Sequence, residues 1–296
     1  MFRRRLQRAA LLVLTLLVVT VGARLAEAVE TTSVQPADDV LFDESFAVRP
    51  GERLTVDLGS EAVTVRSVRG DRARVRVEGE GRDAAEAFER RRFTARTTRD
   101  GLEVRTQPRR RWLSFWGTTD ARLAVVIEVP RRFDVTVDVG SGAVSVGELD
   151  GDLSVDTGSG AVRVADHRGD VHVDTGSGAV RLGDVDGRLV VDTGSGAVAA
   201  GSVTGPVEID TGSGAVSVTV LGRESVAIDT GSGGVSVTVP RRSGWDLELE
   251  GGLVEIDDAL AFRGTRGRRE AEGRLGDGGP RLEVDTGSGR IRIGTR

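Results

Sequence analysis

Aliphatic residues recur between residues 138 and 239 in pairs that are separated by one polar or small residue. One series of pairs comprises Val144 with Val146, Val162 with Val164, and Val180 with Leu182. A second series comprises Leu153 with Val155, Val171 with Val173, and Leu189 with Val191. Alternation with a period of two is typical of a β-strand that buries one face. Each series therefore predicts one strand per repeat, with the aliphatic side chains pointing inward and residues such as Arg163 pointing outward.

The pairs recur together with the sequence Asp-Thr-Gly-Ser-Gly, which begins at Asp156, Asp174, Asp192, Asp210, Asp229 and Asp285. Successive copies lie 18 residues apart from Asp156 to Asp210, and the next copy follows after 19 residues. Glycine beside Asp or Ser predicts turns between the strands. Since so short a unit cannot bury its aliphatic face alone, we predict an all-β fold with one repeat per coil of a parallel β-solenoid. Parallel crossovers are almost always right-handed, so we expect a right-handed solenoid.

A third inward position falls between the two pairs of each repeat. It holds Leu149, Val185, Val203 and Leu221, and His167 takes this position in one repeat. The position is either a corner or a short third strand, so the sequence leaves open whether a coil has two or three faces.

The chain on either side of the regular repeats is also rich in predicted strands. Alternating patterns cover residues 40–48, 53–58, 61–67, 72–78, 93–97, 102–106 and 122–129, and residues 84–92 predict a short helix. We therefore expect an N-terminal β region over 29–130 that caps a solenoid over 131–296. After Pro240, residues 247–256 suggest two irregular rungs. The Arg- and Gly-rich residues 258–280 predict a long exposed loop before the last rung, LEVDTGSGRIRI.

Residues 1–28 have the features of a secretory signal peptide. Four arginines precede an apolar stretch from Ala9 to Val21, and Ala26-Glu27-Ala28 is a small-x-small cleavage site. We therefore expect an extracytoplasmic protein that is secreted, periplasmic or on the cell surface. An uncleaved segment would instead anchor the chain to a membrane. With no Cys, the chain has neither disulfides nor a thiol for lipid attachment.

Charge and motif context exclude several function classes. The formal net charge is -5, and loss of the basic residues 1–28 would make the chain more acidic, which disfavours nonspecific nucleic-acid binding. Asp-Thr-Gly-Ser also occurs in aspartic proteases, but evenly spaced copies indicate architecture and not a paired catalytic site. His167 points inward and His172 outward, so we expect no shared metal site. The sequence predicts no catalytic residue and no cofactor.

The recurring Asp forms a column that includes Asp138 and the five repeats Asp156, Asp174, Asp192, Asp210 and Asp229. Two carboxylates one coil apart repel by roughly 0.9 kcal/mol even in bulk water. We expect each Asp to accept hydrogen bonds from backbone N–H groups of its own Thr-Gly-Ser turn, which would offset this repulsion. The alternative is that the five repeats hold calcium between coils.

One segment concentrates aromatic and basic residues in a chain that is only 4% aromatic, and it comprises Arg109, Arg110, Arg111, Trp112, Phe115 and Trp116. We expect this segment to cap the first coil, because an open solenoid end exposes apolar surface and strand edges. Alternatively it contacts an anionic membrane surface or an acidic glycan, since Arg beside Trp suits both.

Residues 40–296 contain four motifs in a fixed order: FAVRPGERLTVD, VVIEVP, the serial SGAVxV rungs and the final VDTGSGRIRI. With this ordered set, the chain resembles a bacterial β-strand-repeat family of unknown function whose members are described as candidate adhesins. The resemblance implies an extracytoplasmic β-solenoid and brings no catalytic residue. We predict a noncatalytic adhesin or cell-envelope structural or interaction protein, whose envelope or surface partner the sequence does not name. The alternatives are a calcium- or glycan-binding module and, more remotely, a β-helical carbohydrate-active enzyme.

Overall fold

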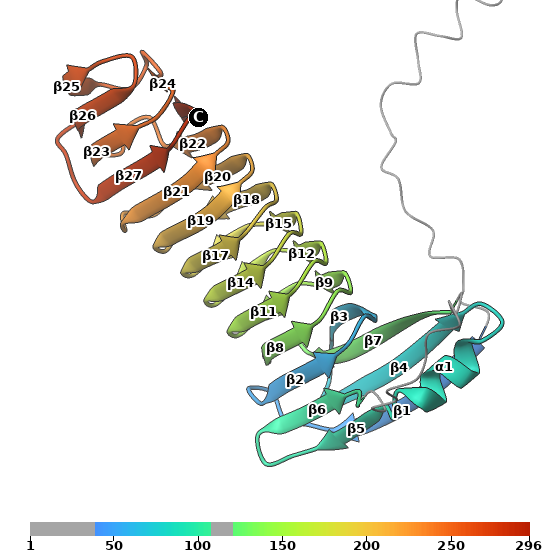
Figure 1. Ribbon diagram of the computed structural model, residues 1–296. Helices are drawn as coiled ribbons and strands as arrows, with labels where there is room; N and C mark the ends of the chain where they lie inside the picture. The colour runs from blue at the N-terminus through green and yellow to red at the C-terminus, as the bar shows by residue number, and fades with distance from the viewer. Residues whose placement is uncertain (1–38, 108–120) are drawn as a thin grey trace, which may run out of the picture. The chain divides into compact units, whose positions relative to one another are not determined.

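The computed structural model describes residues 39–107 and 121–296, which fold into two large β-sheets (Figure 1). Over these residues the first sheet has 15 strands and the second has 13. Most neighbouring strands are parallel, and each successive coil adds strands to both sheets. The predicted all-β solenoid is therefore confirmed, whereas the predicted signal peptide, residues 1–28, lies outside the described residues.

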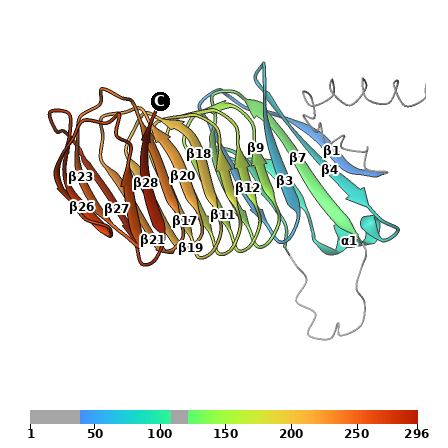
Figure 2. The ribbon, with the colours of Figure 1, turned by 90° about the horizontal axis from the view of Figure 1, so that it is seen from above.

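Within each regular coil, the chain forms a strand of the second sheet and then a strand of the first sheet. Their strands in the first sheet are β9 (Val144–Val146), β12 (Val162–Val164), β15 (Val180–Leu182), β18 (Val198–Val203), β20 (Val216–Val220) and β22 (Val235–Val239). Their strands in the second sheet are β8 (Asp134–Val139), β11 (Leu153–Thr157), β14 (Val171–Thr175), β17 (Leu189–Thr193), β19 (Val207–Ser213) and β21 (Val226–Ser232). Equivalent residues of adjacent coils pair, as Val155 does with Val173. Figure 2 shows the resulting stack of coils from above.

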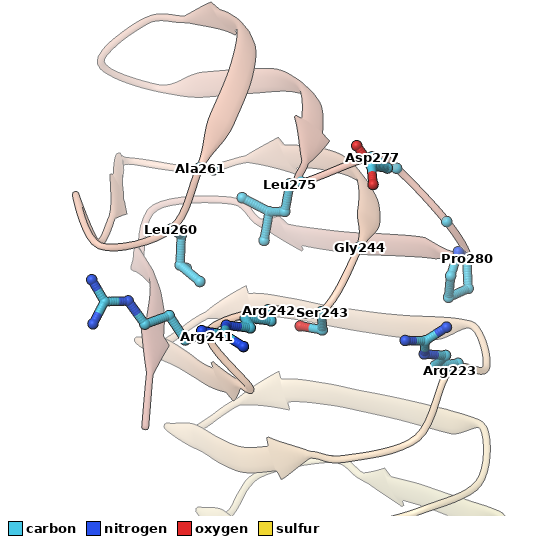
Figure 3. Close-up of a pocket in the computed structure, with 13 residues that line it drawn as sticks. Arg223, Arg241, Arg242, Ser243, Gly244, Leu260, Ala261, Leu275, Asp277 and Pro280 are labelled. Carbon is cyan, nitrogen blue, oxygen red and sulfur yellow. The ribbon is translucent and has the colours of Figure 1, made fainter.

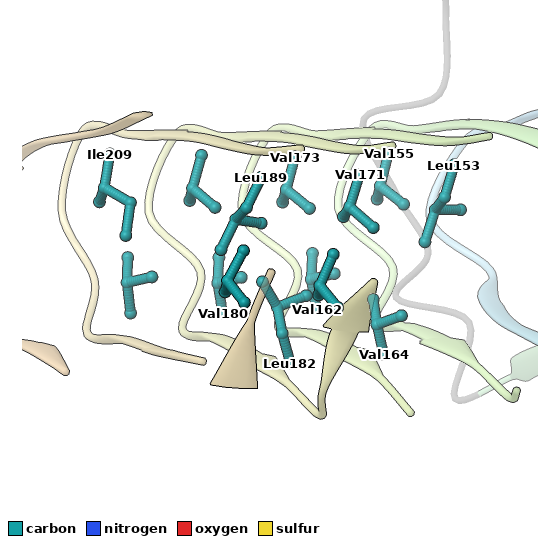
Figure 4. Close-up of a cluster of buried hydrophobic side chains, with 14 of the residues drawn as sticks. Leu153, Val155, Val162, Val164, Val171, Val173, Val180, Leu182, Leu189 and Ile209 are labelled. Carbon is teal, nitrogen blue, oxygen red and sulfur yellow. The ribbon is translucent and has the colours of Figure 1, made fainter. Parts of the chain in front are cut away.

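The core lies between the two sheets. Val173 of the second sheet and Val180 of the first are fully buried, whereas Arg163 is exposed. Figure 4 shows the inward side chains of successive coils in rows. Burying one such side chain contributes about 1.5–3 kcal/mol to folding, so the stacked rows supply the main stabilising term. The predicted inward and outward assignment of the paired positions is confirmed.

The third inward position is a short strand. β10 (Leu149–Asp150), β13 (His167–Arg168) and β16 (Val185–Asp186) pair in parallel and belong to the first sheet. The prediction for Leu221 is wrong, because Val220 pairs with Val203 and is buried while Leu221 is half-buried. The register between β18 and β20 shifts between the pairs Ala199–Ser217 and Ser202–Thr219, because β18 has one extra residue there. A shift of one residue turns a side chain to the other face of the sheet, so Val220 and not Leu221 points inward.

At the N-terminal end, β2 (Arg53–Leu58) and β3 (Ala62–Val68) form a coil that pairs with β8 and β9. β6 (Gly101–Arg105) and β7 (Arg122–Pro130) then pair in parallel with β2 and β3. The antiparallel strands β5 (Thr94–Thr97), β4 (Arg72–Glu80) and β1 (Asp39–Ala47) lie outside them. The helix α1 (Ala84–Arg90) contacts β1, β4 and β7. The strands and the helix predicted in this region are confirmed.

At the C-terminal end, the order of coils in space differs from their order in the sequence. β27 (Arg281–Thr286) lies between β21 and β23 (Trp245–Glu250), and β28 (Arg290–Thr295) lies between β22 and β24 (Leu253–Ile256). The last coil in the sequence, β27 with β28, therefore lies in space between the two coils that precede it in the sequence, β21 with β22 and β23 with β24. Figure 1 shows β27 beside β21, with β23 farther out.

The loop predicted at 258–280 is wrong, because this segment contains a β-hairpin of β25 (Phe262–Arg266) and β26 (Glu270–Leu275). β26 pairs antiparallel with β23 and buries Ala271 and Leu275. The hairpin turn covers the edge of β24, since Val254 N donates to Arg268 O at 2.9 Å and Gly251 N to Arg269 O at 2.7 Å. The frequent Arg and Gly, typical of a loop, conceal these two short strands.

Candidate functional site

One column of carboxylates follows the outer face of the second sheet, and we call it the carboxylate ladder. Its members pair strand by strand in register and are all exposed: Asp57, Asp138, Asp156, Asp174, Asp192, Asp210, Asp229, Asp285 and Glu250. Arg105 on β6 stands next to the first member, with its Nε 3.9 Å from Asp57 Oδ2. The ladder is thus longer than the column predicted from the regular repeats.

Threonine caps the turn in three repeats, through Thr157, Thr175 and Thr286, whereas among the described residues the buried Oγ1 atoms of Thr193, Thr211 and Thr230 have no hydrogen-bond partner. The expected role of Asp in that turn is wrong. Thr175 Oγ1 accepts a hydrogen bond from Gly178 N at 3.1 Å, and Thr286 Oγ1 accepts one from Gly289 N at 3.0 Å. Within 39–107 and 121–296, the Asp174 carboxylate accepts no hydrogen bond. The reason is the strand alternation: Asp174 points outward from β14, whereas the next residue, Thr175, points inward at the corner and is buried.

Two of the ladder carboxylates, Asp138 and Asp210, have raised pKa values. Partial burial raises the pKa of Asp210, and the neighbouring Asp192 and Asp229 raise it further. Partial burial also raises the pKa of Asp138, with additional contributions from Asp156 and Asp57. The second sheet therefore carries a row of negative charges whose mutual repulsion is not offset by hydrogen bonds from the turns.

The side-chain geometry gives the calcium alternative no support. In the part of the chain that the structure describes, no group of three or more His, Asp or Glu side chains is placed to hold a metal ion. Calcium takes about 6–8 oxygen ligands, and each coil adds one ladder carboxylate. The predicted calcium ligands Asp156, Asp174, Asp192, Asp210 and Asp229 lie in one row along the sheet and do not surround a common point.

Other aspartates join neighbouring coils. Asp166 Oδ1 accepts a hydrogen bond from Asp184 N at 2.9 Å, and Asp184 Oδ1 accepts one from Ser202 N at 2.7 Å. Asp170 Oδ1 accepts one from Arg188 N at 2.9 Å, one coil farther along. These contacts were not predicted, although Asp recurs at an 18-residue spacing outside the main motif, which is a usable signal in the sequence. Their role is to fasten one coil to the next.

The two histidines lie in different surroundings. His167 is buried in the column of Leu149 and Val185, and its Nε2 lies 2.6 Å from Gly151 O. Burial lowers the pKa of His167, and the Gly151 carbonyl with the nearby Asp150 and Asp152 partly opposes this shift. His172 is exposed on the outer face of the second sheet. The structure does not bring the two histidines together.

The predicted contact residues Arg109, Arg110, Arg111, Trp112, Phe115 and Trp116 lie outside the described residues. Their role as a cap or as a contact loop for a membrane surface or glycan stays a prediction.

Comparisons with known proteins identify a family and several solved structures. A family model described as Toastrack DUF4097 matches residues 52–294. No match is found among curated proteins. A candidate adhesin from Bacteroides fragilis is 12% identical, covering 87% of this chain and 98% of the other, with a TM-score of 0.45. A candidate adhesin from Parabacteroides distasonis is 11% identical, covering 87% and 98%, with a TM-score of 0.38. A candidate cell adhesion protein from Clostridium sporogenes is 11% identical, covering 87% and 100%, with a TM-score of 0.25.

Proposed function

Because the chain belongs to the Toastrack DUF4097 family, we propose that it is a noncatalytic interaction protein of the cell envelope, with an adhesin-type role outside the cytoplasm. Its β-solenoid is the scaffold and the carboxylate ladder is the contact surface. The ladder selects a partner that presents basic groups along an extended face.

The observation that carries this proposal is that the fold does not use the ladder charges. Thr175 caps the turn in place of Asp174, and the raised pKa of Asp210 reports that its ionised form is disfavoured. Asn or Ser would fit the same outward positions without charge repulsion. Strand spacing places the carboxylates about 4.8 Å apart, so a regular charged row faces solvent. A regular row of exposed charges that makes no hydrogen bonds to the turns is well suited to contact with a partner.

The location rests on the sequence of residues 1–28, whose basic start and apolar stretch are typical of an exported protein. Across the described residues, none of the helices has the length and apolar character needed to cross a bilayer.

The test is cross-linking of the chain in native envelopes, followed by identification of the captured molecules. The ladder variant combines Asp174→Asn, Asp192→Asn and Asp210→Asn. The matched control combines Arg163→Ser and Arg181→Ser on the outer face of the first sheet, where Ser145 and Ser217 already occupy the same column. We expect the parent and the control to capture the same partner and the ladder variant to lose it.

Two results would contradict the proposal. Equal capture by the ladder variant would exclude the carboxylate ladder as the contact surface. Turnover of an envelope polysaccharide by the purified chain would instead favour a carbohydrate-active enzyme.

A further inference from the structure

A cavity of about 420 Å³ lies near the C-terminal end of the array (Figure 3), and none of its lining residues belongs to the carboxylate ladder. The segment between β20 and β21 contributes Arg223, and the turn between β22 and β23 contributes Arg241 and Arg242. The loop from Gly276 to Pro280, between β26 and β27, forms the opposite side. The insertion of β27 beside β21 brings these segments together, although they are distant in the sequence.

The cavity has an excess of unpaired positive charge. Among the described residues, the guanidinium groups of Arg223, Arg241 and Arg242 form no ion pair, and Asp277 is the one acidic residue of the lining. Other arginines near this end are paired, as in Arg274 Nε with Asp246 Oδ1 at 3.4 Å. The lining therefore carries three guanidinium groups against one carboxylate, although the net charge of the whole chain is -5.

The walls of the cavity are held in place by buried groups. Trp245 is fully buried, and its Nε1 donates to Ser243 Oγ at 3.0 Å. Ser243 Oγ in turn donates to the Pro240 carbonyl oxygen at 2.6 Å. Leu260 and Leu275 are buried beneath the lining and give it an apolar part. Backbones also meet here, since a Cβ at Gly279 would lie 2.6 Å from Gly244 O. The backbone next to Arg241 and Arg242 is therefore held in place.

We propose that this cavity binds an acidic saccharide through its carboxylate. A cavity of this volume is in the range of small-molecule sites, roughly 300–1,000 Å³. Guanidinium groups bind carboxylates through two parallel hydrogen bonds. Asp277 accepts hydrogen bonds from sugar hydroxyls and disfavours a more highly charged anion such as phosphate. The site is independent of the carboxylate ladder and of the proposed basic partner.

The test is calorimetric titration of the full chain with a galacturonate trimer, a neutral galactose trimer and inorganic phosphate. The site variant combines Arg241→Ser with Arg242→Ser, and the control combines Arg163→Ser with Arg181→Ser, which removes the same charge elsewhere. We expect the galacturonate trimer to bind the parent and the control alike and to bind the site variant about tenfold or more weakly. The neutral trimer and phosphate should bind much more weakly than the galacturonate trimer.

Each other outcome overturns the proposal. Equal weakening in the control would indicate nonspecific attraction by net charge. Equal binding of the neutral trimer would exclude recognition of the carboxylate, and tighter binding of phosphate would make the site a phosphate site. Absence of binding to the parent would exclude this ligand class. If the double variant does not fold, Arg223→Ser, which alters the cavity from a different segment, provides the same comparison. None of these titrations involves the carboxylate ladder, so a negative result would exclude the saccharide site without bearing on the proposed function.

Discussion

The buried carboxylate of Glu61 pairs with the guanidinium of Arg91 and so joins the end of α1 to the first coil. Glu61 is 2% exposed, and its Oε2 accepts hydrogen bonds from Gly59 N and Ser60 N, both at 2.8 Å. In this coil Glu61 takes the place of the second glycine of the later motif, and Leu58 takes the place of the threonine. The glutamate therefore caps the turn of this coil with its side chain, as threonine does in the coils of Thr157 and Thr175, and it also links the solenoid to the helix.

Replacing Glu61 should destabilise the N-terminal end. Glu61→Ala removes the acceptor of two backbone N–H groups and leaves Arg91 without its partner, which should cost about 1–3 kcal/mol. Glu61→Gln keeps an acceptor for the turn and loses the ion pair, so its cost should be smaller. Thermal unfolding of the two variants measures both effects. A melting temperature of Glu61→Ala equal to that of the parent would show that neither contact stabilises the fold.

The sequence predicts which face of a strand is buried better than it predicts which strand lies beside it. Val162 and Val173 follow from alternation within a repeat and from the spacing between repeats, both of which are local patterns. The insertion of β27 between β21 and β23 is a long-range choice, and the aliphatic pattern of β27 fits any neighbouring coil equally well. The sequence also indicates the ladder positions, but only the backbone geometry shows that Thr175 caps the turn instead of Asp174.

The inward columns should tolerate no charge. Val173→Asp loses about 1.5–3 kcal/mol of apolar burial and adds the penalty of an unpaired buried carboxylate, so it should unfold the array or sharply lower its melting temperature. Arg163→Asp places the same side chain on the outer face and should change the melting temperature little. Circular dichroism during heating checks both. Similar losses in the two variants would reject the inward and outward assignment.

The second glycine of the motif is required by the close stacking of coils. A Cβ at Gly178 would collide with the Gly160 carbonyl oxygen and lie 2.9 Å from Thr175 Oγ1. Gly178→Ala should therefore cost about 1–3 kcal/mol, the usual range for overpacking. The matched control is Gly234→Ala, since its Cβ would lie 3.7 Å from the nearest atom, Arg290 O, and most repeats have alanine there.

Chemical denaturation measures the two glycine variants. Gly234→Ala should be neutral or stabilising by about 0.4–1 kcal/mol, because alanine restricts the unfolded chain. Equal stability of the Gly178 and Gly234 variants would contradict the role of coil stacking. The same stacking, and not a positive φ, constrains Gly176, since Gly176 does not have a positive φ.

Neutralising one ladder carboxylate should stabilise the fold at neutral pH. The pKa of Asp210 is raised above its ordinary value of 3.8, so this group favours folding most at low pH, and its contribution falls as pH rises through the two pKa values. Asp210→Asn should therefore raise stability at pH 7 by about 0.2–1 kcal/mol after solvent screening. The gain should disappear near pH 3 and shrink in about 1 M salt. A lower melting temperature at pH 7 would indicate that the carboxylate does stabilise the fold.

His167 should make the solenoid sensitive to mild acid. Its Nε2 lies 2.6 Å from Gly151 O, and its buried Nδ1 has no hydrogen-bond partner, so a second proton would occupy an unsatisfied buried site. Burial lowers the pKa of His167 below the ordinary 6.5, and the unfolded chain therefore takes up the proton first as pH falls. The stability from neutral His167 is complete above about pH 6.5 and decreases below it, until the folded histidine is also protonated.

The test variant is His167→Leu, which introduces the residue found at position 149 of the same column. It should lose the Gly151 contact, but its melting temperature should fall less than that of the parent between pH 7.5 and pH 5. The exposed His172→Ala should keep the slope of the parent. A slope unchanged in His167→Leu would assign the acid sensitivity to other groups.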